Sequence, residues 1–152
     1  MTHNYLFVCR HNIMRSPYAA KWLKDYCKEH GIDAKVRSAG LYATHPFTTQ
    51  LTKKDVEWAD TIFAMEEYIE QTIVDAYAPE PNKKIINLDI PDIFTHVIID
   101  SQTPYDDNAE PDQAVKILEK GYENYGFTRH FGKKFFYKVL HAKLEDIIKE
   151  TS

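Results

Sequence analysis

The stretch "YLFVCRHNIMRSPYAA", Tyr5 to Ala20, decides the fold class of this chain. An apolar run ends at a cysteine, Cys9, and a short loop leads from it to a serine-proline pair. The apolar run is typical of a buried strand. Ser16 suits a helix N-cap and Pro17 suits the first helical position. We therefore expect a strand, a tight loop and a helix in direct succession.

The remaining sequence alternates apolar runs with helical periodicity, which is typical of a parallel sheet with crossover helices. We expect strands over residues 4–8, 34–38, 60–65 and 83–88. Helices are expected over residues 17–30, 52–59, 66–77, 111–125 and 133–150, and Gly31 should end the first of them. The predicted fold is a three-layer α/β domain over residues 1–152, with a four-stranded parallel sheet flanked by helices and a phosphate-binding loop after the first strand.

The composition is that of an ordinary soluble domain, with 43% apolar and 28% charged residues in 152. A formal charge of -4 gives no reason to expect nucleic acid or an anionic membrane as a partner. The sequence has no signal-peptide pattern and no apolar run long enough to cross a bilayer, so we expect a cytoplasmic protein. Its two cysteines, Cys9 and Cys27, should be free thiols there.

The loop after Cys9 has the features of an anion site. In an open parallel sheet, ligands bind at the carboxyl ends of the strands, where backbone N–H groups at a helix start collect around an anion. The planar guanidinium of Arg15 can bind two phosphate oxygens bidentately, and its charge favours the thiolate form of Cys9. Ser16 can hydrogen-bond the sulfur. The expected phosphate-binding residues are Arg10, His11, Asn12, Ile13, Met14, Arg15 and Ser16.

The segment "VCRHNIMRSP" resembles the signature loop of the low-molecular-weight protein tyrosine phosphatases, which is Cys-x5-Arg-Ser-Pro with Asn at the third place after the cysteine. The likeness extends to "RSAG" at residues 37–40 and "DTIFAME" at residues 60–66. There are departures: Arg10 and His11 replace small residues, Met14 stands where many members carry a second cysteine, and the Asp-Pro-Tyr-Tyr acid motif is absent.

The resemblance implies an enzyme that hydrolyses phosphotyrosine in a protein substrate, without metal or other cofactor. Cys9 would form a cysteinyl-phosphate while Arg15 holds the phosphoryl oxygens. Asn12 should hold the loop conformation through a left-handed backbone and hydrogen bonds to Ser16 and Ser38.

A general acid is needed to protonate the leaving phenolate. Asp92, in "LDIPDIF" just after the fourth expected strand, is the first candidate, because "IPD" resembles the start of the family's acid loop. Asp100 in "VIID" and Asp106 in "TPYDD" are the alternatives, since the alignment in this region is ambiguous.

Two other functions stay open. An arsenate-reductase relative would use the same loop but needs partner cysteines, and Cys27 is expected to pack in the core. A non-catalytic phosphate-binding module is the second. The loop aromatics Tyr42, Phe47 and Phe94 either wall a slot for a phenyl ring or cover the core.

Overall fold

The computed structural model describes residues 2–13, 15–90, 110–116 and 133–151. The chain forms two compact units, residues 1–90 and residues 91–151. The first unit contains the four-stranded sheet and the loop that follows Cys9. That both units form the single domain expected over residues 1–152 stays a prediction.

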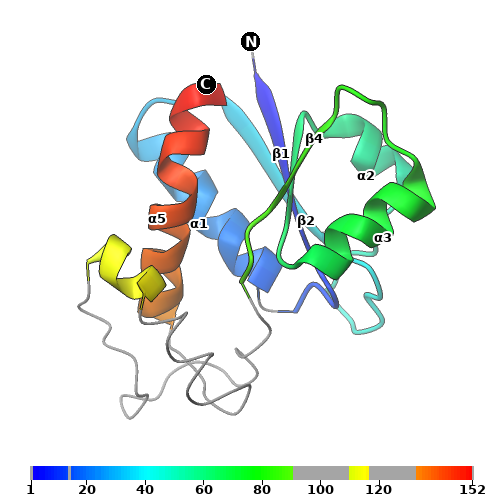
Figure 1. The fold of residues 1–152 in the computed structure, drawn as a ribbon, viewed down its shortest axis with the longest axis horizontal. Coiled ribbons are helices and arrows are strands. Elements are labelled where there is room, and N and C mark those ends of the chain that lie inside the picture. Colours follow the sequence, from blue (N-terminus) through cyan, green and yellow to red (C-terminus); the bar gives the residue numbers. More distant parts are fainter. Residues whose placement is uncertain (1, 14, 91–109, 117–132, 152) are drawn as a thin grey trace. The chain divides into compact units, whose positions relative to one another are not determined.

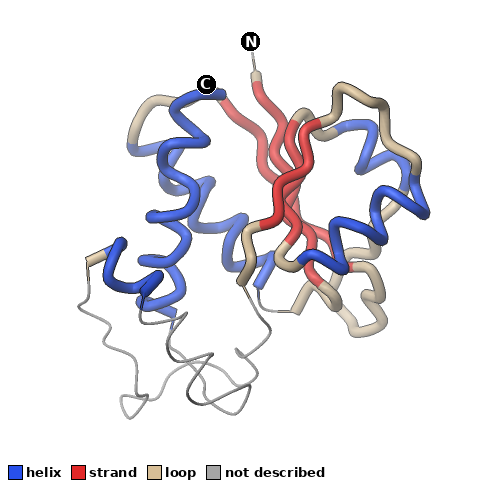
Figure 2. The backbone as a smooth tube through the Cα atoms, viewed as in Figure 1, coloured by secondary structure: helices blue, strands red, loops and turns tan. Residues whose placement is uncertain are grey.

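The first unit is built on a four-stranded parallel sheet, as expected (Figure 2). Its strands are β1 (His3–Cys9), β2 (Ala34–Gly40), β3 (Thr61–Ala64) and β4 (Lys84–Asn87), in the spatial order β2-β1-β3-β4. The interior strand β1 is covered on both faces, and its residues 5–8 have no exposed surface. An uninterrupted apolar run is what such a strand requires, because neither face meets water.

Helices cover both faces of this sheet, which confirms the three-layer α/β fold. α1 (Arg15–Glu29) lies on one face, and α2 (Lys53–Trp58) and α3 (Glu67–Tyr77) lie on the other (Figure 1). Across the sheet, Phe7 of β1 is paired in register with Phe63 of β3, and their rings stack with centroids 4.9 Å apart.

The end of α1 follows the expected glycine signal. Gly31 has a left-handed backbone, with φ 65°, and the N–H of Ile32 donates to the carbonyl of Cys27 at 2.8 Å. This is the geometry in which a glycine after the last turn satisfies carbonyls that the helix leaves unpaired. The chain can then reverse into β2.

In the second unit, residues 111–116 are helical and α5 spans Lys133–Thr151. These match the start of the helix expected over residues 111–125 and the whole of that expected over residues 133–150. Five apolar side chains recur at helical spacing along α5 and have no exposed surface: Phe136, Val139, Leu140, Leu144 and Ile148. No helix in the described part of the chain is both long and apolar enough to cross a membrane.

The strand order places a functional edge at the end of β1. From β1 the chain runs through α1 to β2 on one side, and later through α2 to β3 on the other side of β1. The crossovers therefore separate at the carboxyl end of β1, and ligands bind at such a switch point in open α/β sheets. Cys9 is the last residue of β1.

Candidate active site

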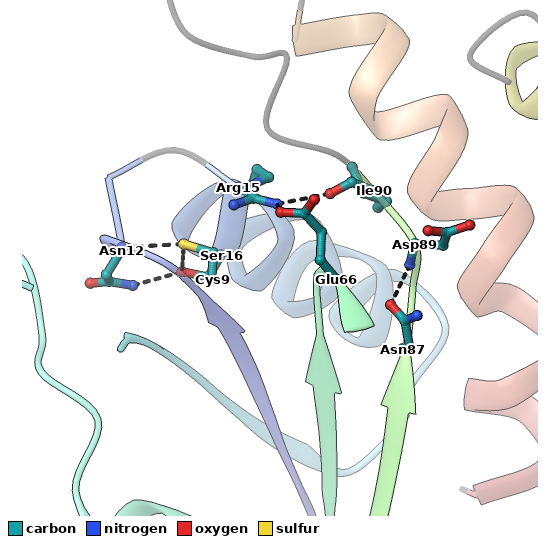
Figure 3. Close-up of polar contacts among 8 residues, drawn as sticks. All are labelled: Cys9, Asn12, Arg15, Ser16, Glu66, Asn87, Asp89 and Ile90. Carbon is teal, nitrogen blue, oxygen red and sulfur yellow. Dashed lines mark hydrogen bonds and ion pairs between the residues drawn. The ribbon is translucent and has the colours of Figure 1, made fainter. Parts of the chain in front are cut away.

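Cys9 is held at this edge by two hydrogen-bonding groups (Figure 3). Its side chain is almost completely buried, with 3% of the residue exposed. The backbone N–H of Asn12 donates to Sγ at 3.2 Å, and the Ser16 hydroxyl lies 2.9 Å from Sγ. With the hydroxyl as donor, both groups stabilise a negative charge on the sulfur. The sulfur therefore lies where an N–H and a hydroxyl can both donate to it.

Asn12 fixes the loop in the way expected from the sequence. Its backbone is left-handed, with φ 57°, a conformation that asparagine tolerates better than most residues. Its Nδ2 donates to the hydroxyls of Ser16 and Ser38, both at 2.9 Å. Its Oδ1 accepts from the backbone N–H of Thr49 at 2.8 Å. The predicted bonds are confirmed, and the side chain of Asn12 ties the loop to α1, to β2 and to the segment after β2.

Ser16 has a different role from the helix cap predicted for it. α1 begins at Arg15, so Ser16 lies inside the first turn. Its hydroxyl contacts the Cys9 sulfur and the Ala39 carbonyl, the latter at 3.3 Å. The N-cap assignment is therefore wrong, and the predicted hydrogen bond to the sulfur is confirmed. A short hydroxyl side chain satisfies either environment equally well, which is why local sequence rules could not separate the two.

Gly40, at the end of β2, lies directly against the loop. A Cβ added there would stand 2.7 Å from the backbone N of Asn12 and 2.7 Å from the carbonyl carbon of His11. The N–H of Leu41 donates to the Cys9 carbonyl at 3.0 Å, and that of Tyr42 donates to the Arg10 carbonyl at 2.8 Å. The loop and the segment after β2 are thus packed backbone to backbone, which only a residue without a side chain allows.

Arg15 is the first residue of α1, and only 3% of its side chain is exposed. Its Nη1 donates to Oε2 of Glu66 at 2.8 Å and to the carbonyl of Ile90 at 2.9 Å (Figure 3). The first turn of α1 contains no acidic residue, so nothing in that turn offsets the positive end of the helix dipole. The helix start thus adds positive potential at the loop after Cys9, while the charge of Arg15 is paired with Glu66.

Exposed aromatic and apolar side chains lie on the loops that meet here. Tyr42 is 53% exposed, and the guanidinium carbon of Arg10 lies 5.8 Å from the centre of its ring. The Nδ1–H of His11 donates to the Tyr42 carbonyl at 3.0 Å. Ile13 is 47% exposed, and Phe47, with φ 68°, is fully exposed. Tyr42 and Phe47 therefore do not cover the core.

Several residues predicted for this site lie outside the described residues: Met14, Phe94, Asp92, Asp100 and Asp106. Asp89 is the described acid closest to Asp92 along the chain. Its backbone is left-handed, with φ 54°, and its N–H donates to Oδ1 of Asn87 at 2.8 Å. Its carboxylate points away from Arg15 (Figure 3). Asp89 is therefore not directed at the anion site.

Cys27 is separate from this arrangement. It lies on α1, is 4% exposed, and burial raises the pKa of its thiol. It has the core position expected from the sequence. Within the described ranges, no group of three or more His, Cys, Asp or Glu side chains could hold a metal ion.

A buried cysteine that lies between hydrogen-bonding groups at a helix start is an arrangement in which a thiol can serve as a nucleophile toward an anionic electrophile. The structure joins Cys9, Asn12 and Ser16 by hydrogen bonds, as predicted, whereas Arg15 at the start of α1 is hydrogen-bonded to Glu66 and Ile90. Sequence reasoning assigned no role to Glu66 or to Gly40. Both residues end segments that share the family resemblance, "DTIFAME" for Glu66 and "RSAG" for Gly40, and Glu66 also follows the third parallel strand, which places it at the same edge as Cys9.

Comparison with a protein family confirms the resemblance seen in the sequence. The model of the family "Low molecular weight phosphotyrosine protein phosphatase" matches residues 4–49 of this chain. This range covers nearly all of β1, together with α1 and β2, and ends in the loop that carries Tyr42 and Phe47. No curated protein matches the chain in a sequence comparison.

Solved structures share the fold over nearly the whole chain. The low-molecular-weight protein tyrosine phosphatase from T. tengcongensis is 22% identical, with 97% of this chain and 99% of that chain covered and a TM-score of 0.63. A low-molecular-weight phosphotyrosine phosphatase from Vibrio cholerae is 20% identical, with 99% of each chain covered and a TM-score of 0.59. YwlE, an arginine phosphatase found in Bacillus subtilis, is 19% identical, with 97% and 96% covered and a TM-score of 0.60. At these identities the likeness establishes the fold.

Proposed function

We propose that this protein is a phosphatase that hydrolyses phosphotyrosine in protein substrates through a cysteinyl-phosphate intermediate. One observation carries the proposal: the Cys9 sulfur accepts a hydrogen bond from the Asn12 N–H and lies 2.9 Å from the hydroxyl of Ser16, in the first turn of the helix that begins at Arg15. The family match over residues 4–49 supports the same activity.

In the first step, the Cys9 thiolate attacks phosphorus, an S–P bond forms and the P–O bond to the leaving group breaks. Arg15 and the backbone N–H groups of loop residues 10–14 bind the three equatorial oxygens of the phosphoryl group. An aspartic acid donates its proton to the departing phenolate, which is a poor leaving group without it. Asp92 is our candidate, with Asp100 and Asp106 as the alternatives.

In the second step, water attacks the cysteinyl-phosphate and the same carboxylate takes a proton from that water. The S–P bond breaks, inorganic phosphate leaves, and the thiolate of Cys9 is restored with the help of the Ser16 hydroxyl. Neither step requires a metal ion.

Aromatic side chains at the loop support an aryl phosphate as the substrate. Tyr42 is bound to the first two loop residues, Arg10 and His11, through its backbone, and its exposed ring lies on the same short segment as Phe47. Such rings can flank a phenyl group, whereas phosphoserine has no ring to contact. Because the neighbour YwlE is an arginine phosphatase, phosphoarginine is the natural competitor.

The two alternatives predict different behaviour. An arsenate reductase needs a second reactive thiol, whereas Cys27 is buried and burial raises its pKa. A non-catalytic module would bind phosphate without turnover.

The test is turnover of p-nitrophenyl phosphate without added metal, followed by peptides carrying phosphotyrosine, phosphoserine or phosphoarginine. We expect phosphotyrosine to be preferred. Cys9→Ser should abolish turnover while leaving phosphate binding and the fold intact, because a serine hydroxyl stays protonated there. Turnover near the wild-type rate in this variant would exclude the covalent mechanism, and reduction of arsenate with a thiol donor would favour the reductase.

A further inference from the structure

Glu66 contacts the candidate phosphate-binding arginine, yet the steps above give it no role. It is the N-cap residue of α3 and follows β3 by two positions, at the same sheet edge as Cys9. Its side chain makes no hydrogen bond to the start of its own helix. By contrast, Thr52 caps α2 with its hydroxyl in a reciprocal capping box with Asp55. The Glu66 carboxylate is therefore used for a contact across 51 residues instead of a local cap.

The contact fixes one side of the Arg15 guanidinium. Nη1 carries two hydrogens, and it has two acceptors in the structure: Oε2 of Glu66 at 2.8 Å and the carbonyl of Ile90 at 2.9 Å. Because the guanidinium is planar and rigid, two acceptors on one terminal nitrogen set the orientation of the whole group. The opposite edge, formed by Nε and Nη2, has the spacing that takes two oxygens of a phosphate.

The surroundings make this pair more than a surface contact. The Arg15 side chain is 3% exposed and the Glu66 side chain 22%, so water screens the interaction less than it does for exposed pairs. Ile90 is the last residue of the first unit, two positions before Asp92. Arg15 thus joins three parts of the chain: the start of α1, the start of α3 and the end of the β4 segment.

We propose that Glu66 is a positioning residue that holds Arg15 by Nη1 and so aims its opposite edge at the phosphoryl group. The inference rests on the proposed function for the identity of the anion. The positioning role predicts the opposite of what charge alone predicts, because a carboxylate near the site by itself repels phosphate. Removing Glu66 should therefore weaken phosphate binding if it positions Arg15, and strengthen binding if it is only a nearby charge or a competitor that phosphate displaces.

The experiment measures the Kd of inorganic phosphate by calorimetry in the wild type, Glu66→Ala, Glu66→Gln and Glu67→Ala, at one pH and ionic strength. Glu67→Ala is the matched control, since it removes the same charge from the adjacent, exposed residue of α3. We expect Glu66→Ala to bind phosphate about tenfold more weakly, the order expected when a charge-assisted hydrogen bond is lost. Glu66→Gln should recover most of the affinity, because its amide oxygen can still accept from Nη1, and Glu67→Ala should bind as tightly as the wild type or slightly more tightly.

Urea titration of each variant gives the folded fraction. If Glu66→Ala is not folded, Glu66→Gln decides: phosphate binding no tighter than in the wild type supports positioning, and tighter binding supports a charge that only repels phosphate. Kinetics with p-nitrophenyl phosphate should show a lower kcat in Glu66→Ala as well as a higher KM, because the arginine also stabilises the transition state. Equal or tighter phosphate binding in Glu66→Ala, or tighter binding than the wild type in Glu66→Gln, would overturn the positioning role, whether or not the wild type is a phosphatase. If Glu66→Ala binds phosphate more weakly than the wild type but the wild type shows no turnover, the positioning role is supported and the proposed function is refuted.

Discussion

Gly40 offers a quantitative test of how tightly the anion loop is built. In Gly40→Ala, the added Cβ would stand 2.7 Å from the Asn12 nitrogen and from the His11 carbonyl carbon, about 0.7 Å short of the 3.4 Å at which ordinary contact begins. Both neighbours are backbone atoms, so no side chain can rotate away. Asn12 is also held by Ser16, Ser38 and the N–H of Thr49. The loop must therefore shift as a unit, away from β2.

Such overpacking costs about 1–3 kcal/mol of the free energy of unfolding. The loss of catalytic rate should be more pronounced than the loss of stability, because a displacement on the order of 1 Å at a reacting group costs roughly 10²-fold in rate. We expect kcat/KM for p-nitrophenyl phosphate to fall by about 30- to 100-fold. Urea denaturation gives the first quantity, and steady-state kinetics on the folded variant gives the second.

Gly31→Ala is the matched control, because the same methyl group is added after the carboxyl end of α1, whereas the loop that Gly40 contacts precedes the amino end of α1. Nothing lies within 4 Å of its Cβ position, but φ is +65°, so the cost is backbone strain of about 1–2 kcal/mol. Stability should fall by a similar amount in both variants, and activity only in Gly40→Ala. The reasoning is refuted if Gly40→Ala keeps activity within twofold of the wild type, or if Gly31→Ala loses as much activity.

Two further predictions concern the thiols and the general acid. Iodoacetate at mildly acidic pH should alkylate Cys9 much faster than Cys27, whose pKa is raised by burial, and phosphate should protect Cys9; preferential labelling of Cys27 in mass spectrometry would contradict this. Asp92→Asn should lower kcat on phenyl phosphates by about 10²–10³-fold, and the loss should shrink as the leaving phenol becomes more acidic. Asp100→Asn should behave nearly like the wild type, and a steep leaving-group dependence in that variant would move the acid to the later loop.

Much of the fold was predictable from sequence because its signals are local. The apolar run before Cys9 predicted a buried strand, and the structure has β1 in the interior of a parallel sheet. Gly31 ends α1 because few other residues adopt its backbone conformation at low cost. The loop between Cys9 and Arg15 was predictable for the same reason, since its cysteine, arginine and helix start lie within seven consecutive residues.

Other features of the site depend on contacts between distant segments, which only the tertiary structure decides. Ser16 could have capped α1 or faced the sulfur, and the choice follows from where β1 and β2 end relative to the helix. The need for glycine at position 40 comes from the close approach of β2 to the loop, 28 residues from Asn12. Glu66 reaches Arg15 because β1 and β3 are paired in register, so that the ends of these strands share one edge. Local sequence sets which conformations each segment can adopt, but the pairing of strands determines which side chains meet.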